Sequence, residues 1–239
     1  MPLGLLGTKV GMTQVYDENG MVSPVTVLQL GPCPVLQVKS TEPLTNQTRA
    51  DGYYAVQLGY QDKLRRKATR PESGHVSSKM ESKRRAAGGK PLRPKPECEP
   101  QKVIKEFRLD TASTLTVGSM LTIKDVFAIP MSVDVIAKRK GRGFQGVMKR
   151  HGFGGLPAAH GAKKVHRQQG GTGSLASNRG SGRMKQGKKM AGRYGATQIT
   201  IRNLVIVKII PEENLLLVRG AVPGPNGGVV TVRPTNMKR

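Results

Sequence analysis

The chain has 239 residues, of which 40 are Lys or Arg and 15 are Asp or Glu, and its formal net charge is +25. A surplus of this size repels itself in a compact monomer, so it indicates a polyanionic partner such as nucleic acid, whose phosphates release counterions when they are neutralised. The longest apolar run, residues 204–207, is too short to span a bilayer, and the sequence offers neither an amphipathic helix nor a lipid-anchor motif for attachment to a membrane surface.

The parts of the chain that can fold read as β structure. The predicted strands are short, rich in β-branched residues, and bounded by Gly, Pro and Asn. The first two flank Asp17-Glu18-Asn19-Gly20, which contains the Asn-Gly signal of a hairpin turn. In chain order, strands are predicted at residues 9–16, 22–30, 35–39, 53–60, 103–109, 121–123, 198–210, 215–218 and 229–232.

A first basic tract interrupts these strands. Residues 63–95 hold 12 basic residues against Glu72 and Glu81. Three prolines in this range, Pro96 just after it, and an Ala-Ala-Gly-Gly run favour a loop or an extended arm. A short helix is expected near residues 77–85. We assign residues 61–101 to a basic, Pro- and Gly-rich insertion, and a solvated, flexible insertion without a partner is the alternative.

A second basic tract carries most of the surplus charge. From Val135 to Pro211 there is no Asp or Glu but 17 Lys or Arg, which leaves 23 basic and 15 acidic residues in the rest of the chain. Residues 138–195 are also rich in glycine, which costs backbone entropy on ordering and adds nothing to a core. We therefore expect this segment to order against a partner, and a disordered basic tail is the alternative.

Together these patterns predict a mainly all-β protein. A β-barrel globular domain is expected from residues 1–130 and 196–239, because closing a sheet removes its exposed edges. Residues 131–195 are predicted to form a long, basic, largely irregular inserted loop.

Two glycine-rich motifs resemble nucleotide-binding loops but lack their partners. Residues 141–146 match G-x-G-x-x-G, yet no acidic residue follows before Glu212, where a ribose contact needs one about 20 positions on. Residues 182–189 nearly match a P-loop, but Lys189 stands where Mg²⁺ coordination needs Ser or Thr. Neither motif predicts a cofactor.

The histidines and cysteines do not form a recognisable metal or catalytic pattern. His151, His160 and His166 lie in the acid-free tract, so contact with phosphate or with bases is the favoured interpretation. Cys33 and Cys98 have no metal-ligand or disulfide spacing. The sequence therefore predicts no catalytic residue, no metal, no cofactor and no small-molecule substrate.

What remains is phosphate binding by basic side chains, which indicates a nucleic acid as the partner. Arg bonds a phosphate through two N–H groups and Lys acts as a mobile point charge. Phe144, Phe153 and Tyr194 are candidates for stacking on bases or for anchoring the loop in a small apolar patch. The predicted RNA-binding residues are Lys63, Arg65, Arg66, Arg84, Arg85, Lys138, Arg139, Lys140, Arg142, Phe144, Gln145, Lys149, Arg150, His151, His160, Lys163, Lys164, His166, Arg167, Arg179, Arg183, Lys185, Lys188, Lys189 and Arg193.

Four blocks of sequence, in order along the chain, resemble the family of ribosomal protein L three of the large subunit. They are Gly-Leu-Leu-Gly-Thr-Lys-Val-Gly-Met-Thr at 4–13, Val-Asp-Val at 133–135 followed by Lys-Gly-Arg-Gly-Phe-Gln-Gly at 140–146 and Lys-Arg at 149–150, Gly-Lys-Lys-Met-Ala-Gly at 187–192, and Asn-Leu-Leu-Leu-Val-Arg-Gly-Ala-Val-Pro-Gly at 214–224. Residues 174–182 and the insertion at 79–100 depart from the compact bacterial pattern.

The resemblance implies a structural constituent of the large ribosomal subunit, with large-subunit rRNA and neighbouring ribosomal proteins as partners. Members of the family bind near the 3′ end of that rRNA, act early in assembly, and extend a loop toward the peptidyl-transferase centre. The expected location is the cytoplasmic ribosome, with an organellar ribosome as a variant. The alternative function is a general nucleic-acid-binding chaperone or compaction protein, and an RNA-modifying enzyme is a more distant one.

Overall fold

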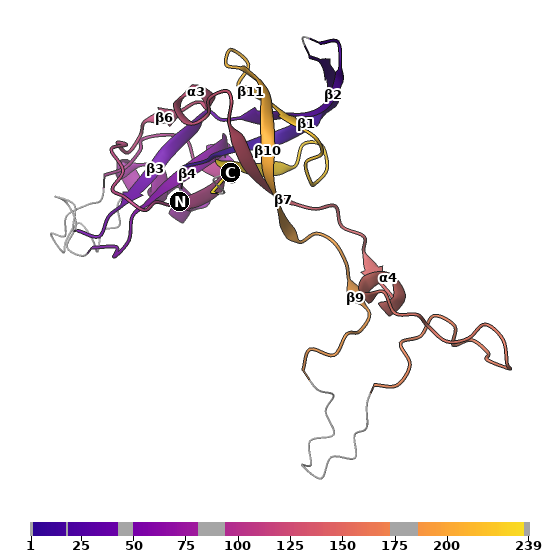
Figure 1. Ribbon diagram of the computed structural model, residues 1–239. Coiled ribbons are helices and arrows are strands. Elements are labelled where there is room, and N and C mark those ends of the chain that lie inside the picture. Colours follow the sequence, from indigo (N-terminus) through magenta and orange to yellow (C-terminus); the bar gives the residue numbers. More distant parts are fainter. Residues whose placement is uncertain (1, 18, 43–49, 81–93, 173–185, 237–239) are drawn as a thin grey trace. The chain divides into compact units, whose positions relative to one another are not determined.

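The computed structural model describes residues 2–17, 19–42, 50–80, 94–172 and 186–236 (Figure 1). It divides into two compact units. The first unit joins Met1–Lys138 to Gln198–Arg239, and the second is Arg139–Thr197.

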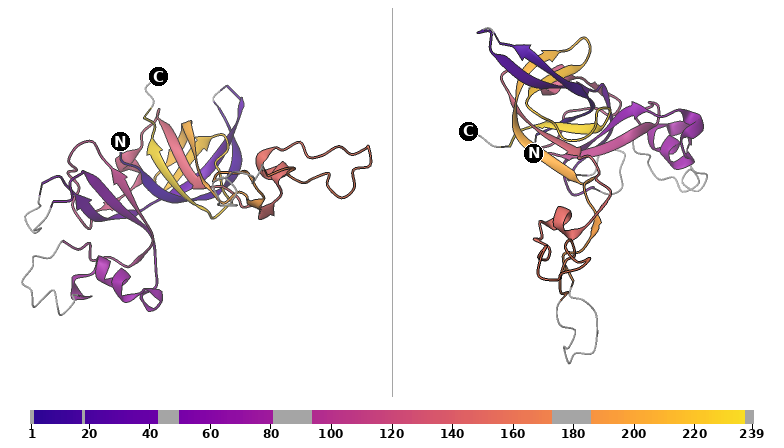
Figure 2. Two further views of the ribbon diagram at one scale, coloured as in Figure 1. Left: turned by 90° about the horizontal axis from the view of Figure 1, so that it is seen from below. Right: turned by 90° about the vertical axis from the view of Figure 1, so that its right-hand side faces the viewer.

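A closed, antiparallel barrel of six strands forms most of the first unit (Figure 2). Each strand pairs with two neighbours, so the ring has no free edge. In order around the ring, the strands are β1 (Leu5–Tyr16), β12 (Val229–Pro234), β7 (Ser132–Lys138), β10 (Gln198–Ile210), β11 (Leu215–Arg219) and β2 (Val22–Leu30).

The first hairpin of the barrel forms where the Asn-Gly signal predicted it. β1 and β2 pair from Gly7 opposite Leu30 to Tyr16 opposite Val22. At the turn, the amide of Gly20 donates a hydrogen bond to the Asp17 carbonyl over 2.8 Å, and Gly20 has a φ of +72°. Only glycine adopts this left-handed backbone without strain, which is why the dipeptide specifies the turn.

The interior of the barrel is filled by aliphatic side chains. Buried residues alternate with exposed ones along β2, as expected for a strand with one wet face, and Leu28 is fully buried. Val135 on β7, Leu216 on β11 and Val232 on β12 are also fully buried and belong to the same core cluster. Side chains of this kind stabilise the barrel by about 1.5–3 kcal/mol each when they leave water.

A second sheet packs its apolar residues into the same core. Its strands are β5 (Gln101–Arg108), β4 (Ala55–Asp62), β3 (Cys33–Lys39) and β6 (Met120–Leu121), in that order. Val56 and Leu58 of β4 are fully buried and join the core cluster that also contains the barrel residues. The first unit is therefore a single hydrophobic body, which confirms the all-β fold class.

Two helices of this unit differ from the sequence expectations. The helix expected near residues 77–85 lies earlier, at α1 (Arg70–Val76), and is followed by the short 3₁₀ helix η2 (Ser78–Met80); residues 81–85 lie outside the described part. Thr69 and Glu72 form a capping box at the start of α1, and another 3₁₀ helix, η1 (Arg65–Lys67), precedes it. The strand predicted at residues 121–123 ends at Leu121, because Thr122 caps the one-turn helix α3 (Ile123–Val126).

One barrel strand was not predicted as a strand. β7 occupies Ser132–Lys138, at the start of the range that the sequence analysis assigned to the inserted loop. It pairs with β10 on one side and β12 on the other. Its Asp134 is 2% exposed and accepts a hydrogen bond from Arg233. The carboxylate of Asp134, which interrupts the apolar pattern of this strand in the sequence, is therefore buried and paired with a cation.

Candidate nucleic-acid interface

The second unit begins as two chain segments running side by side. β8 (Phe144–Gln145) pairs with β9 (Gly192–Arg193) in an antiparallel sheet of two strands. Next to this pair, the amide of Arg142 donates to the Tyr194 carbonyl over 2.8 Å, and the amide of Tyr194 donates to the Gly143 carbonyl over 2.9 Å. These bonds hold residues 142–145 beside residues 192–194.

Two guanidinium groups lie over the ring of Tyr194. The Cζ of Arg139 is 4.8 Å from the ring centroid, and the Cζ of Arg142 is 5.2 Å from it. Such cation–π contacts hold the cations in place, each at about 0.5–1 kcal/mol when exposed. No carboxylate lies between Val135 and Pro211 to neutralise them. The cluster is therefore a fixed pair of positive charges that can bind phosphate.

A short helix on the outgoing limb of the second unit, residues 139–156, contacts the returning limb, residues 186–197. α4 (Val147–His151) ends at Gly152, whose φ of +72° terminates the helix in a left-handed cap. The Nη1 of Arg150 donates to the Met190 carbonyl over 2.7 Å, and the Nε2 of His151 donates to the same oxygen over 3.0 Å. Two residues predicted to bind RNA thus tie α4 to the returning limb.

His166 also makes a contact within the unit. Its Nδ1 donates to the Pro157 carbonyl over 3.1 Å, and its own carbonyl accepts a hydrogen bond from the amide of Leu156. A carbonyl can only accept, so Nδ1 carries the proton and Nε2 faces outward as an acceptor when the ring is neutral. The ring therefore fastens residues 156–166 into a loop.

Most of the other predicted RNA-binding residues in this part of the chain are exposed. The side chain of Phe144 is 73% exposed, which leaves its ring available for stacking on a base. Arg139 and Gln145 are half-buried. Arg179, Arg183 and Lys185 lie outside the described residues. The exposed ones are Lys138, Lys140, Arg142, Lys149, His160, Lys163, Lys164, Arg167, Lys188, Lys189 and Arg193, together with the remaining edge of His166.

The predicted residues of the first basic tract are partly neutralised. The Nζ of Lys63 lies 2.7 Å from the Glu72 carboxylate, and a guanidinium nitrogen of Arg65 lies 2.8 Å from that of Glu99. The hydrogen bond from Lys63 and one from the Thr69 amide lower the pKa of Glu72 to about 2. Arg66 is exposed, while Arg84 and Arg85 lie outside the described residues.

The charge pattern did not predict that Tyr194 holds two arginine side chains in place. The sequence identified it as an aromatic that can stack, but its partner Arg139 lies far earlier in the chain. The only local signal was an aromatic residue between Arg193 and Gly195.

Several known proteins are similar to this chain over nearly its whole length. A family model described as ribosomal protein L3 matches residues 103–214, which include the whole second unit. A protein of Rhodopirellula baltica named large ribosomal subunit protein uL3 is 49% identical over 238 residues, which are 99% of each chain. Proteins of the same name from Acidothermus cellulolyticus and Thermosynechococcus vestitus are 45% and 40% identical over 96% and 99% of this chain, and 91% and 98% of their own.

The chain belongs to the ribosomal protein L3 (uL3) family. It is a structural constituent of the large ribosomal subunit and is located in the ribosome of the cytoplasm. The alignments run nearly end to end, so the insertion at 79–100 adds little net length relative to these relatives.

The family assignment also agrees with how the resembling blocks meet. Thr8 and Lys9, from the first block, lie on β1, and the last block spans β11 and the loop that follows it. The amide of Lys9 donates to the Gly228 carbonyl, and its Nζ donates to the Val222 carbonyl. Among the described residues, there is no cluster of His, Cys, Asp and Glu that could hold a metal ion, and none of the helices is long and apolar enough to cross a bilayer.

Proposed function

We propose that this uL3 family member binds large-subunit rRNA near its 3′ end, supports an early step of subunit assembly, and extends residues 139–197 toward the peptidyl-transferase centre. The first unit, residues 1–138 and 198–239, carries this loop, and the insertion of residues 61–101 contacts RNA or a neighbouring ribosomal protein. The catalytic chemistry of the subunit involves no side chain of this protein.

One observation carries the proposal. The second unit holds Arg139 and Arg142 against Tyr194, in a tract without any carboxylate. A flexible basic tail would have to order these cations on binding and lose side-chain entropy, at about 1.5–2 kcal/mol per long side chain. Cations that are already positioned avoid part of that cost and fix the register of the loop on the RNA.

The proposal is tested by salt-dependent binding. The full-length protein is titrated with a fragment containing the 3′ domain of large-subunit rRNA, and affinity is measured across a range of salt concentrations. The double variant Arg139→Ala/Arg142→Ala is expected to lower the slope of log affinity against log salt by about 2, because each phosphate contact contributes about 1.

The control removes two cations from the barrel unit. Lys102 and Lys124 are exposed and belong to the first unit, outside the acid-free tract. The variant Lys102→Ala/Lys124→Ala has the same net charge as the test variant, so it separates local contact from total charge. An equal loss in both variants contradicts the proposal.

A general nucleic-acid chaperone or compaction protein gives a different result. It binds a fragment from the 5′ domain, or a DNA duplex of the same length, as tightly as the 3′ fragment. It also separates from large subunits in a high-salt gradient. Retention on large subunits together with preference for the 3′ fragment supports the ribosomal role.

A further inference from the structure

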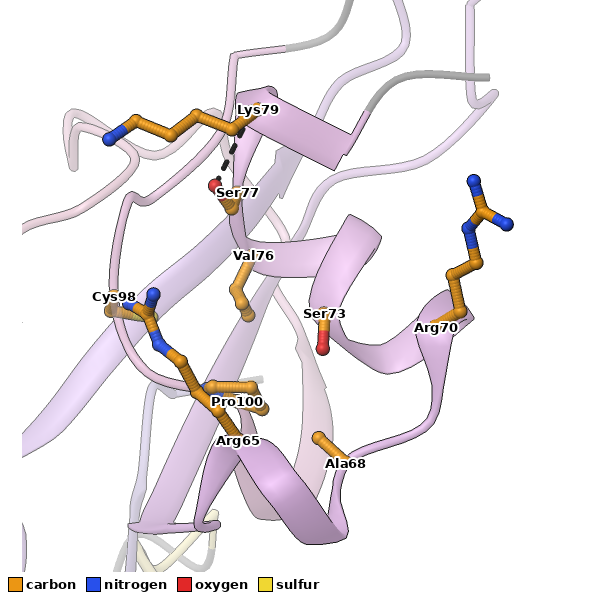
Figure 3. Close-up of a pocket in the computed structure, with 9 residues that line it drawn as sticks. All are labelled: Arg65, Ala68, Arg70, Ser73, Val76, Ser77, Lys79, Cys98 and Pro100. Atoms are coloured by element: carbon orange, nitrogen blue, oxygen red, sulfur yellow. Dashed lines mark hydrogen bonds between the residues drawn. The ribbon is translucent and has the colours of Figure 1, made fainter. Parts of the chain in front are cut away.

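A cavity of about 580 Å³ lies beside α1, in the segment between β4 and β5 (Figure 3). Its volume falls in the range of about 300–1,000 Å³ that is typical of sites for small organic groups. All of the residues that line it belong to the first unit.

The inner wall of the cavity is apolar. Ala68, Val76 and Pro100 contribute to it, and the side chain of Val76, which is 2% exposed, points inward between α1 and the segment that carries Pro100 (Figure 3). The Ser73 hydroxyl points into the same space. A flat, mostly apolar group with a polar edge matches this wall, because its faces would pack on carbon and its edge would meet the hydroxyl.

The mouth of the cavity is basic. Arg70 and Lys79 are exposed, and their charged ends point away from the apolar wall (Figure 3). Arg65 also lines the cavity, but Glu99 binds its guanidinium at 2.8 Å. Hydrogen bonds from Ser78, together with the nearby charge of Lys79, lower the pKa of Glu97. Lys79 therefore faces a carboxylate, and Arg70 is the cation more available to an anion outside the opening.

An apolar slot with cations at its mouth fits one nucleotide of single-stranded RNA. We propose that the cavity takes an unpaired base of the rRNA, with the flanking phosphates at Arg70 and Lys79. Unpaired bases are the part of RNA that proteins recognise by stacking and by hydrogen bonds to base edges. Free phosphate would use only the cations. This inference rests on the proposed binding to rRNA and adds a base-binding site to it.

Cys98 provides a reporter inside the cavity. It lines the wall and is half-buried, whereas Cys33, the other of the two cysteines, is fully buried. Burial raises the pKa of both thiols, that of Cys33 to about 11. Alkylation of the folded protein is therefore expected at Cys98 and not at Cys33, which serves as the internal control.

The test measures how fast iodoacetamide modifies Cys98 in the full-length protein, read by peptide mass spectrometry. The probes are a single-stranded oligouridylate and an oligoadenylate of about 12 nucleotides, an abasic oligomer of the same length, and inorganic phosphate. At about 90% occupancy, a base-bearing strand is expected to slow alkylation about tenfold, while the abasic strand and phosphate leave it nearly unchanged. Equal protection by the abasic strand overturns the proposal.

Charge variants locate the site. Arg70→Ala/Lys79→Ala is expected to raise the oligonucleotide concentration for half-protection about tenfold, since two charged contacts are lost. Lys102→Ala/Lys124→Ala removes the same charge from exposed residues that neither line the cavity nor belong to the predicted RNA-binding set. Equal shifts in both variants contradict a site at this cavity.

The two proposals can fail separately. An rRNA fragment that binds the protein without slowing Cys98 alkylation overturns the cavity site and leaves rRNA binding intact. Failure of the protein to bind any rRNA fragment overturns the proposed function and this inference with it.

Discussion

The Nζ of Lys9 donates a hydrogen bond of 2.8 Å to the carbonyl oxygen of Val222, although the two residues lie near opposite ends of the chain. The main chain of Lys9 is bonded in the same region, since the amide of Gly227 donates to its carbonyl over 2.7 Å. Lys9 is 8% exposed, so its charge is satisfied by main-chain oxygens rather than by water. The residue fastens the loop after β11 to the barrel.

Replacing this lysine should weaken the barrel. Lys9→Met keeps the length of the side chain but removes the donor, which leaves the Val222 carbonyl short of a partner. We expect the free energy of unfolding in urea to fall by about 1.5–3 kcal/mol, the usual contribution of a hydrogen bond from a charged group. Lys102→Met, at an exposed position, should change it by less than about 0.5 kcal/mol.

His75 should make the first unit less stable in mild acid. Its Nε2 donates to the Gln57 Oε1 over 2.9 Å, and burial, followed by the charge of Lys95, lowers its pKa below 6.5. Because the folded state disfavours the protonated ring, the contribution to stability is complete above about pH 6.5 and is lost as the pH falls through the folded pKa.

Two measurements check this behaviour of His75. The NMR titration of its ring should have a midpoint below 6.5. The unfolding free energy of the native protein should fall more between about pH 7 and pH 5 than that of His75→Gln, which cannot titrate. A midpoint at or above the ordinary value would show that the ring is not desolvated in this way.

Tyr53 is the centre of a charged cluster on the second sheet. Its hydroxyl donates to Glu106 over 2.8 Å and accepts from the Nζ of Lys39, which also pairs with Glu106. Burial acts to raise the pKa of Glu106, but the hydrogen bonds from Lys39 and Tyr53 outweigh it and lower that pKa. Tyr53→Phe should therefore move the pKa of Glu106 back toward 4.5, measured by carboxyl NMR. No change would mean that Lys39 alone sets it.

Gly195 should be essential to the second unit but not to the barrel. Its φ is +80°, and a Cβ there would meet the Lys140 carbonyl oxygen at 2.5 Å. Gly195→Ala should separate the two limbs, so the amides of Arg142 and Tyr194 should lose protection from hydrogen exchange, while urea unfolding of the barrel stays unchanged. Gly171→Ala, where the added carbon meets open space, is the matched control. Protection that survives Gly195→Ala contradicts the arrangement described for the limbs.

Much of the β structure follows from local pattern. The predicted strands at residues 22–30 and 198–210 coincide with β2 and β10, where β-branched residues and bounding turns agree with the pairing. β7 was missed because Asp134 breaks its apolar run and Lys138 joins the basic tract. The start of α1 was readable, since Thr69 and Glu72 have capping-box spacing with Pro71 between them, but the surrounding prolines favoured a loop.

The sequence predicted where the positive charge of the candidate site lies along the chain. It did not predict which side chains contact one another. The absence of acidic residues located the basic tract, because charge is a property of composition. The contacts of Arg139 with Tyr194, and of His151 with the Met190 carbonyl, join residues distant in sequence and depend on how two limbs pair. No periodicity encodes such contacts, so the bond of His151 within the chain was not predicted.

The pairing of β1 with β12 sets an order of events during synthesis. Leu5 pairs with Val232, so the ring cannot close until nearly the whole chain has left the ribosome that makes it. Residues 139–197 emerge before that moment. The nascent protein therefore exposes its cationic segment while the barrel is still open. A polyanion such as RNA can reach these charges before the barrel is complete.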